Sequence, residues 1–532
     1  MKPLPLVANA VWAGSGVGRW ARFRRALAHP VREQERLLAD CLRANAVSAF
    51  GRRYGFASIG TMKEYRERVP LSRHADYRED LERVAAGEPG VLTAEPVRRL
   101  AWSSGSTDAA KLVPYTAGLE RAFRRALAPW IVDLFGRAPS LAAGPAFWSV
   151  TPKVARDRLP EAKIPVGFEE DGDYLGGLGR RVVEAALAVP PSVAELAPDD
   201  ARRRTALHLL LARELRVVSV WHPSFFTLLL DDIDARWDEL LAELAERGAA
   251  GRRRARELAG IGPGEPARTW PGLALVSCWA DAHAALGART LSKRLPGVRV
   301  QPKGLISTEA FCSLPFAGRH PLAVRSHVFE LLDGEGRPHG IDEARLGERY
   351  ELVVSTSGGL YRYRTGDLVE VDGFVGRTPS IRFRGRADQV SDRCGEKLSD
   401  GFVAQVLDGL FTHYGARPRF ALLAPEVEDG PPGYVLFLDA PPLPEDAEER
   451  LEQGLGENPH YALCASLRQL APARIEYVED GDARYLAACV ERGRRLGDVK
   501  PAALSAEAGW SRRLRTARPA RRGARPGLAY RP

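Results

Sequence analysis

Short apolar runs alternate with longer helix-like stretches over most of this 532-residue chain. The runs are rich in Val, Leu and Ile, which is typical of strands, and the longer stretches repeat apolar residues at helical spacing. The strand-like runs are 216–221, 273–280, 298–307 and 350–356, and the helix-like stretches include 20–90, 201–215 and 232–258. Strands that alternate with helices predict an α/β fold built around more than one sheet.

The length of the chain exceeds what one hydrophobic core supports, so we expect at least two domains. Near residue 388 a new pattern begins: a helix-like stretch capped by Ser399 or Asp400, two strands, a helix, a third strand and a last helix. These features predict a large N-terminal domain over 1–387, a small α+β domain over 388–508 and a tail over 509–532.

The net charge of +9 is concentrated in the tail. Residues 509–532 hold eight Arg and no acidic residue, so the rest of the chain carries only 9 − 8 = +1. A body so close to neutral does not predict nucleic-acid binding. The Arg-, Pro- and Gly-rich tail predicts disorder, with a binding arm as the alternative.

The apolar segments and the cysteines bear on the compartment. No run approaches the roughly 18 apolar residues that a membrane-spanning helix needs, so no membrane partner is expected. The six cysteines are scattered without metal-ligand spacing, which argues against a disulfide framework or a zinc site and fits a reducing compartment, here the cytoplasm.

The stretch WSSGSTDAAKLVPYT, residues 102–116, combines short hydroxyl side chains, a glycine and one lysine. It lies between a predicted strand at 97–102 and a predicted helix at 117–135, so it is either a phosphate-binding loop or a polar turn. It is not a Walker loop, because Ala110 occupies the second glycine position and Leu112 the position of the magnesium-binding Ser or Thr.

Three later stretches place polar residues where predicted strands end. KGLISTEAF at 303–311 puts Thr308 and Glu309 after a strand, and LYRYRTGDLVEV at 360–371 puts Asp367 in a turn between two strands. IRFRGRADQV at 381–390 ends a strand with Arg386 and Asp388, at the predicted domain boundary.

The order of these motifs resembles the adenylate-forming superfamily: a Ser/Thr/Gly loop, Thr-Glu, Tyr-Arg-x-Gly-Asp and Gly-Arg-x-Asp. Within it, the chain is similar to the auxin-responsive-promoter (Gretchen Hagen) family of acyl-acid amido synthetases, especially its bacterial branch. The resemblance covers nearly the whole chain except the tail. Supporting stretches are FGRRYGF, VPLSRHADYREDLERVAAGEPGVLT, SCWAD, HPLAVRSHVFELL and ENPHYA.

This resemblance implies an α/β adenylate-forming fold with a mobile C-terminal lid, and a ligase that uses ATP and Mg²⁺. A carboxylic acid becomes an acyl-adenylate, and an amine or amino acid then takes the acyl group. The residues that match the family's phosphate loop are Ser103, Ser104, Gly105, Ser106, Thr107 and Lys111.

The remaining roles also follow from the resemblance. Glu309 matches the Mg²⁺ ligand, and Thr308 the residue beside the α-phosphate. Asp367 matches the carboxylate that binds the ribose hydroxyls, and Arg386 an arginine that reaches ribose or phosphate. Glu309 could instead be a structural acid whose hydrogen bonds are satisfied in the core. Asp367 could instead be a turn residue with a structural role only.

Four further positions are compared with the family pattern. Lys500 falls near the place of the small-domain lysine that acts in adenylation, and Asp388 is either the domain hinge or a turn residue. Asp108 stands where the family usually has glycine, and Leu305 where many superfamily members stack an aromatic ring on adenine.

Two alternatives stay open: an acyl-CoA ligase, which passes the acyl group to a thiol, and a non-catalytic nucleotide-binding relative, which Asp108 favours. His222, His327, Tyr115 and Trp279 could line an acyl pocket or pack in the core. The sequence names neither the acid, the acceptor nor the oligomeric state.

Overall fold

The structure is a computed structural model, and it divides the chain into two compact units, Met1–Arg384 and Gly385–Pro532. The boundary expected from the sequence is residue 388. The structure describes residues 3–102, 111–149, 162–166, 182, 184–196, 198–282, 284–387, 390–391, 393–426, 431–492 and 502–516.

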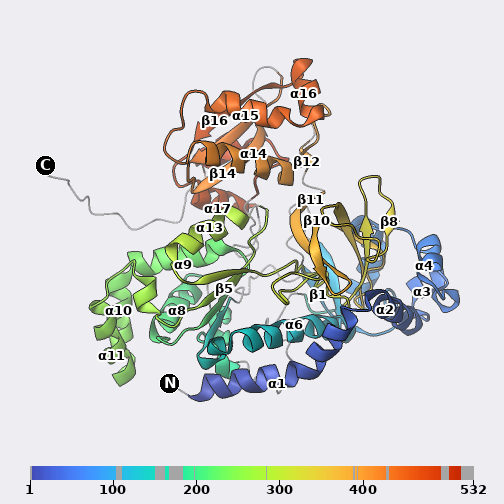
Figure 1. Cartoon of the computed structure of the whole chain (residues 1–532), viewed down its shortest axis with the longest axis horizontal. Coiled ribbons are helices and arrows are strands. Elements are labelled where there is room, and N and C mark those ends of the chain that lie inside the picture. The colour runs from blue at the N-terminus through green and yellow to red at the C-terminus, as the bar shows by residue number, and fades with distance from the viewer. Residues whose placement is uncertain are drawn as a thin grey trace. The chain divides into compact units, whose positions relative to one another are not determined.

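Helices account for much of the first unit (Figure 1). The helices are α1 (Pro3–Ala26), α2 (Pro30–Asn45), α3 (Ala49–Arg53), α4 (Met62–Arg68), α5 (Arg78–Ala85), α6 (Ala117–Arg137), α8 (Pro198–Leu211), α9 (Pro223–Ala235), α10 (Trp237–Glu246), α11 (Gly248–Ala259), α12 (Pro266–Thr269) and α13 (Ala284–Arg294). Helices α1 and α2 are long, whereas α3, α4 and α5, which precede strand β1 (Val97–Trp102), have eight residues or fewer. Short 3₁₀ segments are η1 (Phe56–Ser58), η2 (His74–Tyr77), η3 (Pro139–Ala143) and η6 (Pro191–Glu195).

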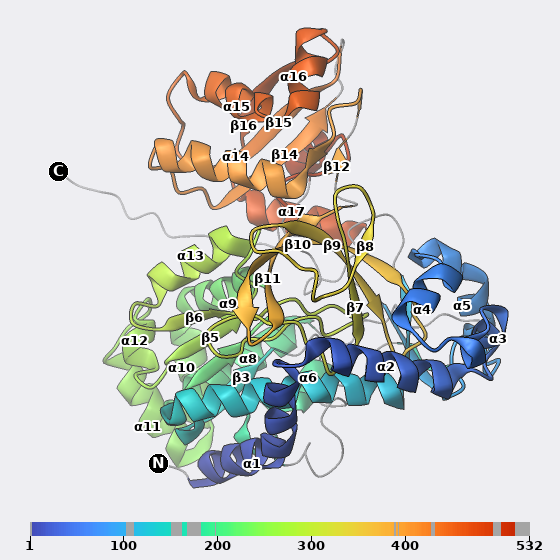
Figure 2. The same ribbon diagram turned by 45° about the vertical axis from the view of Figure 1, so that its right-hand side comes forward.

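A four-stranded parallel sheet lies at the centre of one half of this unit. Its order is β3 (Ala146–Trp148), β4 (Val217–Ser219), β5 (Leu275–Cys278) and β6 (Arg299–Pro302). Val217 and Leu275 join one hydrophobic core with residues of α6, whereas Val218 and Val276 join a second core with residues of α8, α9 and α10. Both faces of the sheet are therefore covered, as parallel sheets require, and α8 and α9 lie beside β5 in Figures 1 and 2.

A five-stranded sheet forms the other half. Its order is β11 (Thr378–Arg386), β10 (Tyr363–Val375), β9 (Arg349–Ser355), β7 (Val328–Leu332) and β8 (Pro338–His339). The pairings of β10 with β9, β9 with β7 and β7 with β8 are antiparallel. Strands β7 and β9 are almost completely buried, so this sheet provides a rigid base for the residues that β10 carries.

The polar stretch 103–110 connects two strands rather than a strand and a helix. Strand β1 (Val97–Trp102) appears as predicted, but residues 112–116 form a second strand, β2 (Leu112–Thr116), before α6 begins. The two strands pair antiparallel from Val97↔Thr116 to Trp102↔Leu112. The helix predicted from residue 117 is confirmed as α6, but strand β2 was not predicted, because an apolar run of five residues carries no clear period.

The second unit contains a three-stranded sheet with helices packed on it. Its elements are β12 (Val390–Ser391), β13 (Leu398–Ser399), α14 (Asp400–His413), β14 (Phe420–Glu426), β15 (Gly433–Asp439), α15 (Ala447–Gly456), α16 (Pro459–Ser466), β16 (Ala471–Tyr477), α17 (Gly481–Glu491) and α18 (Trp510–Thr516). The sheet order is β14-β15-β16, antiparallel and then parallel. Ser399 caps α14 by accepting a hydrogen bond from the N–H of Phe402, one of the two caps expected from the sequence.

Residues 510–516, predicted as part of the disordered tail, form the helix α18. Trp510 and Leu514 are buried and pack with Phe420 and Tyr485 in a hydrophobic core. The carboxylate of Glu426 accepts hydrogen bonds from the N–H groups of Gly509, Trp510 and Ser511, which fixes the start of α18. The Arg-rich composition hid this helix; residues 517–532 lie outside the described residues.

Asp400 predicts a pH dependence for the stability of the second unit. It is buried; its Oδ1 accepts hydrogen bonds from the N–H groups of Ala503 and Leu504, and its Oδ2 has no partner. Burial raises the pKa of Asp400 to about 6, although the two hydrogen bonds act to lower it. The native state therefore holds this proton more tightly than the unfolded chain, so the stability it provides is present below about pH 4 and is lost as the pH rises through about 6.

Asp400→Asn keeps an acceptor and removes the titration. We expect the free energy of unfolding of Asp400→Asn, relative to the natural protein, to increase by on the order of 2 kcal/mol between pH 4 and pH 7. Urea unfolding of both proteins, followed at several pH values in that range, measures this difference. A difference that stays constant with pH would contradict it.

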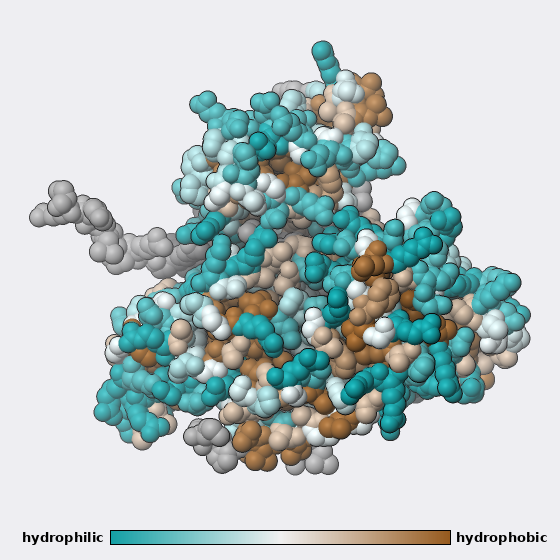
Figure 3. All heavy atoms as spheres, viewed as in Figure 1, coloured by the Kyte–Doolittle hydropathy of each residue, from teal (hydrophilic) through white to brown (hydrophobic). Residues whose placement is uncertain are grey.

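Hydrophilic residues cover most of the face seen in Figure 3, with hydrophobic residues in smaller groups between them. Among the described residues, no helix is both long enough and apolar enough to cross a membrane.

Candidate functional site

Thr308 and Glu309 lie at the tip of a tight turn beyond the carboxyl end of β6. Ile306 and Phe311 form an antiparallel bridge, and the N–H of Ser307 donates to the carbonyl of Ala310 at 3.0 Å. Gly304 precedes the turn with φ of 79°, and a Cβ there would lie 2.7 Å from the carbonyl oxygen of Ser313. The backbone at residue 304 therefore requires glycine.

Two buried side chains hold this turn. The hydroxyl of Tyr115, on β2, donates to the carbonyl of Thr308. The N–H of Phe311 donates to Nε2 of His327 at 3.1 Å. Burial, together with a smaller contribution from Arg125, lowers the pKa of His327 to about 3, so the ring is neutral and carries its proton on Nδ1. The turn that presents Glu309 is thus fixed by residues of β2 and of the segment before β7.

Asp367 lies in an irregularity of strand β10, not in a turn between two strands. The register of β10 against β9 shifts between Arg364 and Leu368, and Gly366 within the shift has φ of 77°. The hydroxyl of Thr365 donates to the carbonyl of Leu352 and accepts from the N–H of Asp367. The extra residues of such a bulge redirect side chains, and here they position a buried carboxylate.

The pKa shifts of Cys312 and His74 show which of the predicted site residues lie near them. Burial raises the pKa of the Cys312 thiol well above its usual range, and the carboxylates of Asp367 and Glu309 add to the effect. Burial likewise lowers the pKa of His74, and the positive charge of Lys111 lowers it too. The hydrogen bond between His74 and the carbonyl of Leu112 raises this pKa, as does the negative charge of Glu309. Lys111 and Glu309 therefore both lie near His74, and Glu309 and Asp367 both lie near Cys312, with Thr308 next to Glu309.

His74 is a residue near Lys111 and Glu309 that the sequence did not single out. It begins η2, and its Nε2 lies 3.1 Å from the carbonyl oxygen of Leu112. A carbonyl can only accept, so Nε2 carries the proton of the neutral ring. The contact ties η2 to the first residue of β2, directly beside Lys111. Only the stretch VPLSRHADYREDLERVAAGEPGVLT, quoted for the resemblance, pointed to this segment.

Lys303 was also missed, and it lies at the carboxyl edge of the parallel sheet. Its side chain is buried, and its Nζ donates to Oγ of Ser219, at the end of β4, over 2.9 Å. The same Nζ lies 4.7 Å from the centre of the Trp221 ring, which itself contacts Trp279 at 5.6 Å between centroids. This edge is where α/β sheets bind ligands.

The predicted site residues divide into two groups. Lys111, Thr308, Glu309 and Asp367 lie in the first unit, near His74 or Cys312 as described above, and Arg386 ends β11 as predicted. Ser103, Ser104, Gly105, Ser106, Thr107, Asp108, Asp388 and Lys500 lie outside the described residues. Leu305 is partly buried against the large core.

The donor set suits a hard divalent cation. Glu309 is half-buried at the tip of its turn, and Thr308 beside it adds a hydroxyl. Oxygen ligands of this kind are those that Mg²⁺ prefers. The residues present therefore fit a magnesium ion.

The fold matches that of a solved acyl acid amido synthetase. Similarity to the structure titled "AtGH3.15 acyl acid amido synthetase in complex with 2,4-DB" covers 95% of this chain and 96% of that one, with a TM-score of 0.82 and 18% sequence identity. A second structure, "GH3.15 acyl acid amido synthetase", matches with a TM-score of 0.79 over 93% of this chain and 94% of that one, at 18% identity. The predicted α/β adenylate-forming fold is confirmed.

Three family models match the sequence. They are the GH3 family N-terminal domain over residues 19–300, the GH3 family central domain over 323–386 and the GH3 family C-terminal domain over 406–508. Together they span most of the chain, so it belongs to the GH3 family.

Curated relatives agree with this assignment. The chain is 26% identical over 545 residues to a probable indole-3-acetic acid-amido synthetase, GH3.4, of Oryza sativa subsp. japonica, which covers 88% of this chain and 85% of the relative. It is 20% identical over 535 residues to the indole-3-acetic acid-amido synthetase GH3.4 of Arabidopsis thaliana, which covers 89% of each. The predicted enzyme class, a ligase of the acyl-acid amido synthetase type, is confirmed.

Proposed function

We propose that this protein joins a carboxylic acid to an amino acid in two steps that consume ATP. In the first step a carboxylate oxygen attacks the α-phosphorus of ATP, a new O–P bond forms, and pyrophosphate leaves. In the second, an amine nitrogen attacks the acyl carbon, the amide forms, and AMP leaves. The placement of Lys111, Thr308, Glu309 and Asp367 near His74 and Cys312, in a chain of the GH3 family, carries the proposal.

Each residue has a proposed task in this sequence of steps. Lys111 compensates the negative charge of the phosphates, and the hydroxyl of Thr308 lies at the α-phosphate. Asp367 accepts hydrogen bonds from the two ribose hydroxyls. Glu309 would hold Mg²⁺, which when bound neutralises phosphate charge.

The remaining assignments rest on the family resemblance alone. Ser103, Ser104, Gly105, Ser106 and Thr107 surround the phosphates with Lys111. Arg386 reaches ribose or phosphate, and Lys500 acts at the α-phosphate during adenylation.

We place the acyl group beside the aromatic cluster of Trp221 and Trp279 at the carboxyl edge of the parallel sheet. The six cysteines are free thiols, which supports a reducing compartment such as the cytoplasm. The bacterial branch of the family remains a prediction from the sequence motifs.

Exchange of labelled pyrophosphate into ATP tests the first step. Screened against aromatic, aliphatic and hydroxy acids, the protein should catalyse exchange only when a suitable acid is present. Hydroxylamine or amino acids should then trap the acyl group, whereas trapping only by coenzyme A would identify an acyl-CoA ligase. Lys500→Ala serves as the control: exchange should be lost while ATP still binds. Tight ATP binding without exchange over the whole acid panel would make the protein a non-catalytic relative.

A further inference from the structure

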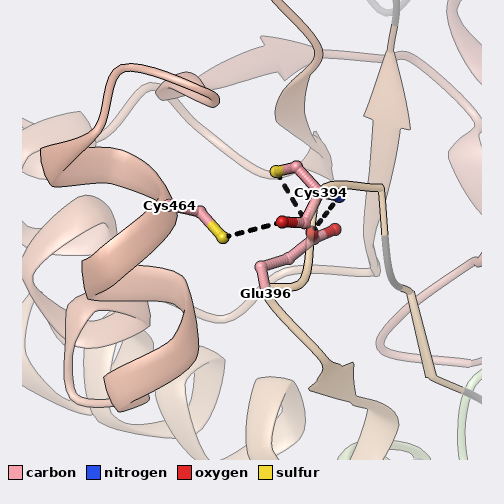
Figure 4. A group of neighbouring side chains, drawn as sticks. All are labelled: Cys394, Glu396 and Cys464. Atoms are coloured by element: carbon pink, nitrogen blue, oxygen red, sulfur yellow. Dashed lines mark hydrogen bonds between the residues drawn. The ribbon is translucent and has the colours of Figure 1, made fainter.

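Two cysteines and a glutamate to which no role has been assigned meet in the second unit. Cys394 and Glu396 lie in the turn between β12 and β13, and Cys464 lies on α16 (Figure 4). Their ligand atoms, two sulfurs and a carboxylate oxygen, all lie within 4.8 Å of one another. Glu396 and Cys464 are buried and Cys394 is half-buried.

Both thiols are turned toward this cluster. The Sγ–H of Cys394 donates to Oε2 of Glu396 at 3.4 Å, and the Sγ–H of Cys464 donates to the carbonyl of Cys394 at 3.3 Å. The turn has a left-handed backbone at Gly395, with φ of 105°, and at Lys397, with φ of 46°. Figure 4 shows the side chain of Cys464 pointing from its helix toward residues 394–396.

The carboxylate of Glu396 is fully buried, and among the described residues no basic side chain forms an ion pair with it. Its Oε1 accepts hydrogen bonds from the N–H of Arg393 at 2.7 Å and from the hydroxyl of Tyr434 at 2.6 Å. Its Oε2 accepts from the N–H of Cys394 at 2.8 Å. With the Cys394 thiol included, four uncharged donors therefore satisfy this buried carboxylate, and outer hydrogen bonds of this kind also orient metal-binding carboxylates.

We propose that Cys394, Glu396 and Cys464 bind a zinc-class divalent cation, with water as the fourth ligand. On binding, the two S–H bonds break and their protons pass to solvent, while two metal–sulfur bonds and one metal–oxygen bond form. In a tetrahedral zinc site the sulfurs are about 3.8 Å apart, so the observed cluster needs to contract by only about 1 Å. Half-exposed Cys394 lies on the side from which the cation and the water enter.

The thiols set the chemical class of the cation. Thiolate sulfur selects zinc and similar soft or borderline ions over Mg²⁺ and Ca²⁺, which take oxygen ligands. This site is therefore chemically distinct from the one at Glu309. Metal bound here would join α16 to the β12–β13 turn, through groups that are far apart in the sequence.

Titration of the full chain with Co²⁺ tests the proposal. The protein is reduced and treated with a chelator beforehand, and thiolate-to-cobalt absorption reports sulfur ligation. We expect one equivalent of Co²⁺ to bind and one equivalent of Zn²⁺ to displace it. Cys464→Ser and Glu396→Gln should weaken binding at least about 100-fold, and Tyr434→Phe, which removes an outer hydrogen bond, about 10-fold. Cys489→Ser, a buried cysteine of the other core of this unit, should bind as the natural protein does.

A second measurement needs no variant and so does not depend on how the variants fold. In the natural protein, saturating Zn²⁺ should protect Cys394 and Cys464 from alkylation, while half-buried Cys41 reacts at an unchanged rate. Alkylation of Cys394 that is indifferent to Zn²⁺ would overturn the proposal. So would a Cys394–Cys464 disulfide that forms readily in a protein whose reduced form binds no Zn²⁺, because the pair would then be a redox pair. Neither readout depends on adenylation, so this inference stands or falls separately from the proposed function.

Discussion

Glu309→Gln is expected to reduce acid-dependent pyrophosphate exchange at least about 100-fold while the protein remains folded. The substitution keeps the size of the side chain and removes its negative charge from the tip of the turn held by Tyr115 and His327. An amide is a far weaker ligand for Mg²⁺ than a carboxylate, and losing one such electrostatic contact typically costs about 10²–10³ in rate. The exchange rate should be measured as a function of Mg²⁺ concentration, with circular dichroism and thermal unfolding as checks on folding.

The control for this experiment is a glutamate that lies outside the candidate site. Glu335, in the turn between β7 and β8, is exposed and pairs with exposed Arg337, so Glu335→Gln should leave exchange unchanged. If Glu309→Gln kept exchange within about threefold of the natural rate at every Mg²⁺ concentration, the metal-binding role would be wrong. Glu309 would then be one of the structural acids considered as the alternative.

Features set by local sequence could be predicted, because their cause lies within a few residues. The strand at 97–102 and the helix from residue 117 were correct, and so was Ser399 as one of the two caps expected for α14. Each depends on apolar spacing or on a short hydroxyl at a helix start. Strand β2 was missed, because residues 112–116 become a strand only through pairing with β1.

Features set by pairing across the fold could not be read from the sequence. Asp367 was expected in a turn, but the register between β10 and β9 places it in a bulge, and the register depends on both strands. His74 contacts Leu112 across 38 residues, and Lys303 contacts Ser219 across 84. The scattered cysteines argued against a metal site, yet Cys394 and Cys464 meet across 70 residues. The family resemblance assigned roles to the site residues that local patterns could not assign, because it depends on the order of the motifs along the whole chain.

The largest effect on stability is expected at Glu330, on strand β7. Its carboxylate binds Arg362 through two hydrogen bonds, at 2.9 and 3.1 Å, and binds Arg66 at 2.8 Å. Glu330 is 2% exposed and Arg362 is 3% exposed, so the pair is removed from water. Removing one partner of a buried ion pair leaves an uncompensated charge, which costs about 3–5 kcal/mol.

Glu330→Gln should therefore lower the free energy of unfolding by about 3–5 kcal/mol, measured as a shift of the urea midpoint. Glu335→Gln again provides the comparison, because it breaks an exposed ion pair that contributes at most about 1 kcal/mol. Arg362 also donates to the carbonyls of Arg66 and Val69, and it precedes Tyr363, the first residue of the strand that carries Asp367. Below the unfolding transition, Glu330→Gln should keep the KM for ATP, whereas a raised KM with unchanged stability would mean that Glu330 acts on the site rather than on the fold.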